Sequence, residues 1–395
     1  MKYDFTSVID RRGKDAMAVD AVGVLPAYET PDEGFDFIPM WVADMNFATV
    51  PTVQKAITER VQHPTFGYFF PREEYYQAII QWQESRNHVT RLTKECIGYE
   101  NGVLGGLVSA LHAFAAPGDS VLVHSPTYIG FTGSIISSPL KQDEAGVWRM
   151  DYEDMDRKIK ENQIHIAVFC NPHNPTGRVW EREELEKALE VYRANDCVVI
   201  CDEIWSDIIL NGNHHIPLQS VNEDARNRVI ALYAPSKTFN LAGLIGSYHI
   251  IYNPYLRDRV RACSSKSHYN SMNVLSMHAL IGAYCEEGME WVDELREVLS
   301  QNVNYACDFI KEHFQGVELF KPQGTYMLFL DCSQWCHEHN TDVGELLKAG
   351  HRVGVGWQDG RPFHGEYAIR MNLALPFSRV QEAFRRLKQY VFHAE

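Results

Sequence analysis

Five short apolar runs, separated by amphipathic stretches, constrain the fold more than any other feature of this sequence. The runs are rich in β-branched residues and mostly apolar on both faces. They are VLVHSP from Val121, IAVFCNP from Ile166, CVVICDE from Cys197, VIALYAPS from Val229 and GSYHIIYN from Gly246. Such strands are typical of a mainly parallel sheet that is buried on both sides. The intervening stretches, such as EREELEKALEVYRAN, have the spacing of amphipathic helices. We therefore predict an α/β fold in which helices cover the sheet.

Polar residues collect where these predicted strands end. Ser125, Asn171, Asp202 and Ser236 each follow an apolar run. In open α/β sheets, ligands bind outside the carboxyl ends of the strands. This rim is therefore the predicted binding site.

The pattern changes in the last third of the chain. A long helical stretch begins near Met272, shorter strands follow at GTYMLFLD and YAIRMN, and SRVQEAFRRLKQYVFH has the pattern of an amphipathic closing helix. A chain of 395 residues is long enough for two domains. We predict a large domain over residues 48–285 and a smaller α+β domain formed by residues 1–47 and 286–395.

Charge and composition limit the classes of binding partner and the expected location of the protein. A formal net charge of −15 disfavours nucleic acid and anionic lipid surfaces, so a small molecule is the expected partner. No run approaches the roughly 20 apolar residues of a membrane span, and the first residues lack the apolar stretch of a signal peptide. The expected location is the cytoplasm.

The cysteine and histidine spacings do not favour a metal site. The nine cysteines are expected to be reduced thiols. Cys197 and Cys201 would lie roughly 13 Å apart on a strand, too far to share one metal. His214 and His215 are adjacent and diverge. Four potential ligands lie close together in the sequence, but no second ligand pair follows at zinc-finger spacing; they are Cys332, Cys336, His337 and His339. We predict no metal.

Three motifs carry the predicted chemistry. Lys237, in SKTFN, follows a predicted buried strand, where a lysine is costly unless paired or neutral, although it could also reach solvent. Asp202, in DEI, could protonate a pyridine nitrogen, and such an Asp is also common as a helix cap. NPHNPTG fixes a tight loop that presents Asn174.

Taken in this order, the motifs resemble fold-type I pyridoxal 5′-phosphate (PLP) enzymes, the aspartate aminotransferase superfamily, and the resemblance covers nearly the whole chain. It implies an aspartate aminotransferase-like fold with PLP as cofactor. It also implies that Lys237 forms the Schiff base, Asp202 pairs with the pyridine nitrogen and Asn174 bonds the ring O3′. Tyr128 of SPTYIGF would stack on the ring.

The resemblance also implies a phosphate site and a partner subunit. Backbone N–H groups of Val103 and Leu104 lie where a helix is expected to begin in NGVLGGLVSALHAF, and helix N-termini attract anions. Ser236 would add a side-chain donor. Tyr68 of FGYFFP resembles the tyrosine that reaches the phosphate from the partner, which implies a homodimer with shared active sites.

Substrate contacts are implied on the other side of the pocket. Arg370 of YAIRMN resembles the arginine that binds the substrate α-carboxylate, because a guanidinium can bond both oxygens at once. A surface salt bridge is the alternative role. Tyr326 of GTYMLFLD and Asn174 are expected to line the same side.

Within the superfamily, the chain resembles the MalY/PatB-type branch of cystathionine β-lyases (carbon–sulfur lyases). The segments that carry this resemblance are MWVADMNF, FGYFFP, NPHNPTGRVW, DEIWSDI and APSKTFNLAGL. It implies cleavage of cystathionine or related cysteine S-conjugates to a thiol, pyruvate and ammonia. Lys237 would remove the Cα proton, and Tyr68 and Tyr128 are the candidates for protonating the thiolate.

Two residues depart from the family pattern. Trp205 stands where many of these enzymes have a tyrosine and where this branch often has a histidine. Indole offers only an N–H donor, so O3′ would depend more on Asn174. Asn46 stands where the branch usually has an aspartate, which removes a negative charge near the expected substrate entrance.

Two other functions remain open at this point. An aminotransferase would share the cofactor, the lysine and the early steps, and a non-catalytic regulator could retain the fold. The intact set of Lys237, Asp202, Asn174 and Arg370 argues against a decayed site. An NAD enzyme is disfavoured because no G-x-G-x-x-G stretch follows a strand.

Overall fold

The larger sheet of the molecule contains the five predicted strands and two more. The computed structural model of the chain describes residues 1–131, 135–267 and 270–392. The seven strands lie in the order β2-β10-β9-β8-β7-β3-β4. Their bounds are β2 (Ile97–Glu100), β3 (Val121–Ser125), β4 (Ile135–Pro139), β7 (Ile166–Cys170), β8 (Val198–Asp202), β9 (Val229–Tyr233) and β10 (Ser247–Ile250). The predicted α/β class is confirmed.

The sheet is mixed but mostly parallel. β4, β3, β7, β8 and β9 form successive parallel pairs, whereas β10 is antiparallel to both β9 and β2. Two reversals bring β2 back to the direction of β9. Helix α4 (Val103–Phe114), which follows β2, therefore begins at the rim where β7, β8 and β9 end.

Helices cover both faces of this sheet. Successive strand side chains point to opposite sides, and apolar side chains on both sides have to be buried. Ile200 and Ile230 pack with α4 and α9 in one cluster, whereas Val199 and Cys201 belong to the cluster on the other face. The covering helices are α3 (Glu73–Asn87), α5 (Tyr152–Glu161), α6 (Arg182–Ala194), α7 (Glu223–Arg228), α9 (Pro254–Ser267) and α10 (Val274–Ala283). The helix expected over 181–195 is α6, and a capping box between Glu181 and Glu184 sets its start.

A smaller antiparallel sheet lies in the C-terminal third, in the order β11-β12-β15-β14. Its strands are β11 (Glu318–Leu319), β12 (Met327–Asp331), β14 (Gln358–Asp359) and β15 (Ala368–Asn372). Its helices are α11 (Glu286–His313), α12 (Ser333–Glu338), α13 (Val343–Arg352) and α14 (Phe377–Tyr390). Short elements elsewhere are α1 (Met17–Asp20), α2 (Pro51–Val61), α8 (Pro235–Thr238), β5 (Lys141–Gln142) and β6 (Trp148–Arg149).

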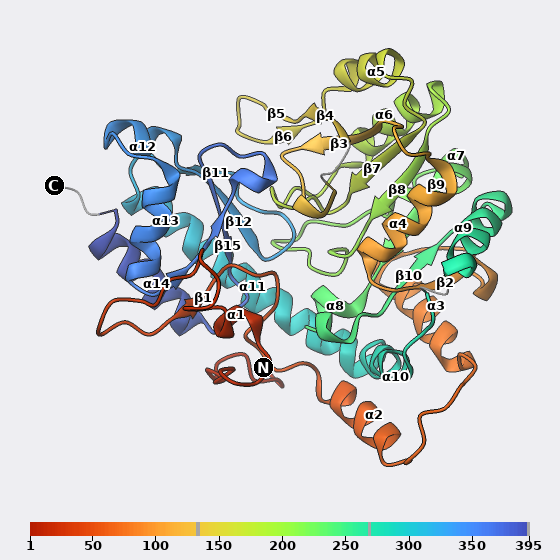
Figure 1. The fold of residues 1–395 in the computed structure, drawn as a ribbon, viewed down its shortest axis with the longest axis horizontal. Helices are drawn as coiled ribbons and strands as arrows, with labels where there is room; N and C mark the ends of the chain where they lie inside the picture. The colour runs from red at the N-terminus through yellow and green to blue at the C-terminus, as the bar shows by residue number, and fades with distance from the viewer. Residues whose placement is uncertain (132–134, 268–269, 393–395) are drawn as a thin grey trace.

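The N-terminal segment joins this C-terminal part. β1 (Ile38–Pro39) pairs in parallel with β13 (Val355–Gly356), and Figure 1 shows the red N-terminal chain beside the blue C-terminal elements. The pairing supports the proposal that residues 1–47 and 286–395 form the smaller domain and residues 48–285 the larger one.

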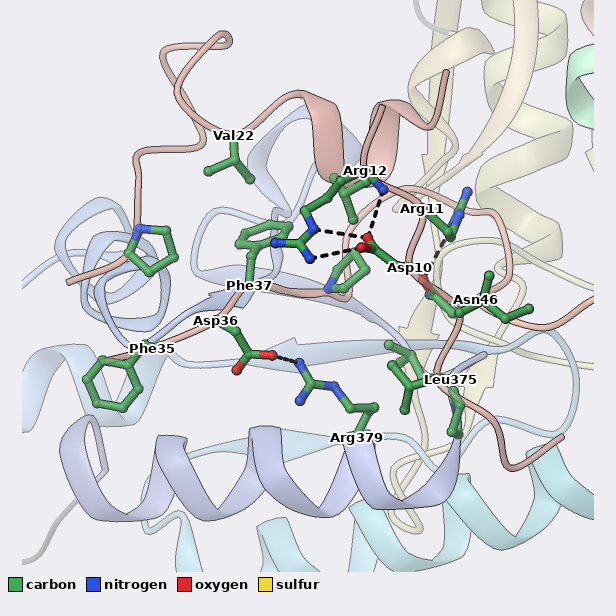
Figure 2. Close-up of a pocket in the computed structure, with 16 residues that line it drawn as sticks. Asp10, Arg11, Arg12, Val22, Phe35, Asp36, Phe37, Asn46, Leu375 and Arg379 are labelled. Atoms are coloured by element: carbon green, nitrogen blue, oxygen red, sulfur yellow. Dashed lines mark hydrogen bonds and ion pairs between the residues drawn. The ribbon is translucent and has the colours of Figure 1, made fainter. Parts of the chain in front are cut away.

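A cavity of about 430 Å³ lies between the N-terminal segment and α14. Figure 2 shows Asp10 bonded to Arg12, and Asp36 bonded to Arg379 from α14. Asn46 lines this cavity, where its side-chain oxygen accepts a hydrogen bond from Arg11. Asn46 is therefore on a different cavity from the one that holds Lys237.

Within the described residues, no helix combines the length and the apolar character that crossing a membrane requires.

Candidate active site

The predicted site residues converge on one cavity of about 360 Å³ at the carboxyl ends of the central strands. Most of them line it directly, although they come from distant parts of the chain. The predicted residues that line this cavity are Val103, Leu104, Tyr128, Asn174, Asp202, Trp205, Ser236, Lys237 and Arg370. The structure thus brings together the residues expected to hold a cofactor and a substrate.

Lys237 lies in the short helix α8, which begins at Pro235 and is separated from β9 by Ala234 alone. Its Nζ donates a hydrogen bond to the carbonyl oxygen of Ala43 at 2.7 Å, and the Tyr326 hydroxyl donates to the same oxygen at 3.2 Å. The amine also lies 5.8 Å from the centroid of the Trp205 ring. A neutral acceptor and an aromatic face therefore hold the amine, and no ion pair is formed with it among the described residues.

Burial, together with the nearby charge of Arg370, lowers the pKa of Lys237 from 10.5 to about 8. The neutral amine is the nucleophile, so we expect the apoprotein to take up PLP faster as the pH rises. The rate should increase about tenfold per pH unit below pH 8 and level off above it. Stopped-flow absorbance would measure this. A profile that keeps rising to pH 10 would contradict a lowered pKa.

Asp202 is the last residue of β8, and its carboxylate is buried beneath the cavity. Oδ1 accepts one hydrogen bond, from the Ile204 backbone N–H at 3.0 Å, and no ion pair of Asp202 occurs among the described residues. Burial raises the pKa of Asp202 to about 6. A buried carboxylate with so few partners is suited to pair with a cationic ring N–H, because the positive charge of the ring would balance the negative charge of the carboxylate.

The N-terminus of α4 opens into the same cavity. Gly102 caps the helix with a φ of +80°, a conformation that favours glycine, and none of the described side chains caps the first turn. The first N–H groups of a helix have no partner within it, and the helix dipole favours an anion there. With Ser236 also on the lining, this end of the cavity is suited to a phosphate.

Arg370 and Asn174 form the opposite side. Asn174 Oδ1 accepts a hydrogen bond from Arg370 Nη1 at 3.2 Å, which leaves the amide N–H groups for other acceptors. Gly177 shapes the loop that carries Asn174: its φ is +70°, and a Cβ there would lie 2.4 Å from Pro322. Burial lowers the pKa of Arg370 to about 10, so the guanidinium is a cation at neutral pH.

The aromatic residues divide into three positions. The Tyr128 ring borders the cavity, next to Phe131, and burial raises the pKa of its hydroxyl. Tyr326 is buried behind the lining, with its ring 4.7 Å from that of Trp205. Tyr68 does not reach this cavity, because it lies fully exposed on the chain between α2 and α3.

Some residues around the cavity carry no sequence signal. Gln358 of β14 bonds Arg370, and Phe363 lies against the guanidinium with its ring centroid 4.4 Å away. The carbonyls of Trp41 and Ala43 accept from Arg370 and Lys237. These contacts arise from backbone position and cross-strand register, so residue type alone does not reveal them.

The donor set fits PLP. The cavity offers a lysine amine of lowered pKa, a buried acid for a ring nitrogen, an uncapped helix end for a phosphate and a tyrosine ring beside them. Lys237, Asp202, Asn174, Ser236, Tyr128 and the start of α4 would hold the cofactor.

Comparisons with known proteins agree with this geometry. The family described as aminotransferase class I and II matches residues 36–387. Cystathionine β-lyase PatB of Bacillus subtilis is 33% identical over 363 residues, covering 89% of this chain and 92% of the relative. The PLP-bound C–S lyase of Staphylococcus hominis has a TM-score of 0.87 at 32% identity and 98% coverage of each chain.

A third relative, cystalysin of Treponema denticola with its PLP cofactor, has a TM-score of 0.90 at 28% identity and covers 99% of each chain. The fold is that of the aspartate aminotransferase-like PLP enzymes, and the cofactor is PLP. The chain belongs to the class I and II aminotransferase family.

Proposed function

We propose that the protein is a PLP-dependent carbon–sulfur β-lyase that cleaves cystathionine or related cysteine S-conjugates to a thiol, pyruvate and ammonia. One observation carries the site chemistry: Lys237, Asp202 and Arg370 surround one cavity, and none of them has an ion-pair partner among the described residues. The likeness to relatives named as cystathionine β-lyases and C–S lyases supports β-elimination as the reaction.

When bound, PLP withdraws electrons from Cα of the amino acid, which lets the Cα proton and then the β-substituent leave. Asp202 would hold the ring nitrogen, and its buried carboxylate would balance the positive charge of a protonated ring. Asn174 would hold the ring oxygen through an amide N–H, because its Oδ1 already accepts from Arg370. The start of α4 would hold the phosphate.

The remaining residues act on the substrate. Arg370 is the buried cation on the cavity wall that binds the α-carboxylate, and Nη1 has one N–H beyond the bond to Asn174 to donate to it. The amine of Lys237, neutral in part at physiological pH, takes the proton from Cα. Tyr128 borders the cavity and is one candidate for protonating the departing thiolate, and Tyr68 of a partner subunit is the other.

The purified protein should release pyruvate and free thiol from L-cystathionine in a one-to-one ratio. Both products are measured, pyruvate with lactate dehydrogenase and thiol with a colorimetric reagent. Transfer of the amine to an added keto acid without thiol release would instead identify an aminotransferase. A protein that binds PLP and does neither would identify a non-catalytic role.

We further propose a homodimer whose active sites are shared. Phe66, Tyr68 and Phe70 stand exposed on the chain between α2 and α3, and Leu104 and Ile245 are exposed apolar residues that line the cavity. Exposed apolar surface of this kind supports a subunit contact. In such a dimer, Tyr68 of one subunit would complete the cavity of the other.

Mixing two inactive variants tests this arrangement. Lys237→Ala and Tyr68→Ala should each be strongly impaired, whereas a mixture exchanged by mild denaturation should regain up to about a quarter of wild-type activity. The reason is that a mixed dimer contains one site with both wild-type residues. If Tyr68 served its own chain, the mixture would regain nothing.

A further inference from the structure

Arg370 is held entirely by neutral groups. Its Nε donates to Gln358 Oε1 at 2.9 Å, and Nη2 donates to the same oxygen. Nη1 donates to Asn174 Oδ1, and Nη2 also donates to the Trp41 carbonyl at 3.4 Å. The side chain is buried, with only 3% of the residue exposed, yet no carboxylate pairs with it among the described residues.

The sheet fixes the contact between Gln358 and Arg370. The two residues are direct partners in the antiparallel pair β14–β15. Cross-strand partners have their side chains on the same face, close enough to interact. Gln358 also lines the cavity, so the contact lies on the wall of the site.

The nearest acid along β14 is turned away from this contact. Asp359 follows Gln358 directly, and successive strand residues point to opposite faces. Both Asp359 carboxylate oxygens accept from Arg361, which forms an ion pair with it at 2.7 Å. The strand therefore places a neutral amide at the guanidinium and directs its carboxylate to another arginine.

We propose that Gln358 is a specificity-determining positioning residue, which fixes the guanidinium of Arg370 while leaving its charge free for the α-carboxylate of the substrate. This inference rests on the proposed function of Arg370. Gln358 occupies Nε and Nη2 through a single neutral oxygen. A carboxylate at that place would form an ion pair with the guanidinium, and the substrate carboxylate would have to compete with it. An apolar side chain would leave two buried donors without a partner.

Two small ligands separate this role from a structural one. L-Alanine carries an amine and a carboxylate but no leaving group, and ethylamine is the same molecule without the carboxylate. Their binding to the PLP-loaded protein is measured by titration of the visible absorbance, so turnover is not needed. Gln358→Glu should weaken L-alanine binding on the order of 10- to 100-fold and change ethylamine binding less than threefold.

The control is Gln389→Glu, which adds the same charge at the end of α14, where Gln389 accepts a hydrogen bond from Arg385 on the surface. This variant should bind both ligands like wild type. Unchanged ethylamine binding also shows that Gln358→Glu is folded and holds PLP. Equal weakening of both ligands would overturn the proposal in favour of a structural role, and unchanged L-alanine binding would overturn it outright.

Failure of the β-lyase function gives a different result. Neither ligand has a leaving group, so the outcome is independent of whether wild type releases pyruvate from L-cystathionine. A wild type that binds L-alanine no better than ethylamine would overturn the role of Gln358 whatever reaction the enzyme catalyses. Gln358→Ala gives a second measure: L-alanine binding should weaken through loss of orientation, and ethylamine binding should not.

Discussion

Replacing Lys237 by alanine is expected to reduce β-elimination on the order of 10,000-fold. The amine is the only lysine on the lining of the cavity among the described residues, and it is assigned both cofactor attachment and the proton transfer at Cα. The absorbance band of the attached cofactor should disappear, because no covalent link forms. Pyruvate release from L-cystathionine and the visible spectrum measure the two effects separately.

The matched control is Lys348→Ala on the exposed face of α13, where the lysine forms a surface ion pair with Glu345. That variant should keep both the spectrum and the rate of wild type. Added methylamine should restore part of the rate of Lys237→Ala, because a small free amine can occupy the space of the lost side chain. Retention of more than 1% of the wild-type rate by Lys237→Ala, without added amine, would disprove the assignment.

Replacing Asp202 by asparagine is expected to lower kcat about 100- to 1,000-fold. An amide cannot balance the charge of a protonated ring nitrogen, so the cofactor would withdraw electrons from Cα less strongly. The KM for substrate should change much less, because the carboxylate is proposed to bind Arg370 and not Asp202. Steady-state kinetics with L-cystathionine distinguish the two constants.

Asp258→Asn serves as the control, since it removes one carboxylate from the exposed face of α9. It should leave both kinetic constants unchanged. Asp202→Glu should recover part of the lost rate, because the charge is restored at a slightly different position. A kcat of Asp202→Asn within threefold of wild type would exclude a role for this acid in the reaction.

The sequence predicted the large sheet well because each central strand is apolar on both faces. All five runs became strands, and the amphipathic stretch 181–195 became α6. β2 and β4 were missed. IGYE in β2 carries a glycine and a glutamate, and IISSP in β4 ends in two serines and a proline, so neither has the apolar pattern. Both lie at the edges of the sheet, where burial constrains the sequence less.

The candidate site was predictable where a residue type and its place in a motif carry the chemistry. Lys237, Asp202 and Asn174 belong to such motifs, and the fold brings them to one cavity. Their roles remain predictions. Gln358 could not be found in this way, because its importance comes from its register opposite Arg370 in a short edge strand. Tyr68 stays a prediction for a further reason, since its proposed place is in another subunit.

One stretch of main chain, residues 41–46, supports both ends of the proposed substrate. The Trp41 carbonyl accepts from Arg370, and the Ala43 carbonyl accepts from Lys237. The Asn372 side chain donates to the carbonyls of Val42 and Asp44. The Asn240 side chain accepts from the backbone N–H of Met45 and donates to its carbonyl. The spacing between the proposed carboxylate site and the proposed base is therefore set by this backbone segment, which the side chains of Asn372 and Asn240 hold in place. A substrate that makes both proposed contacts is therefore an α-amino acid, whatever leaving group it carries.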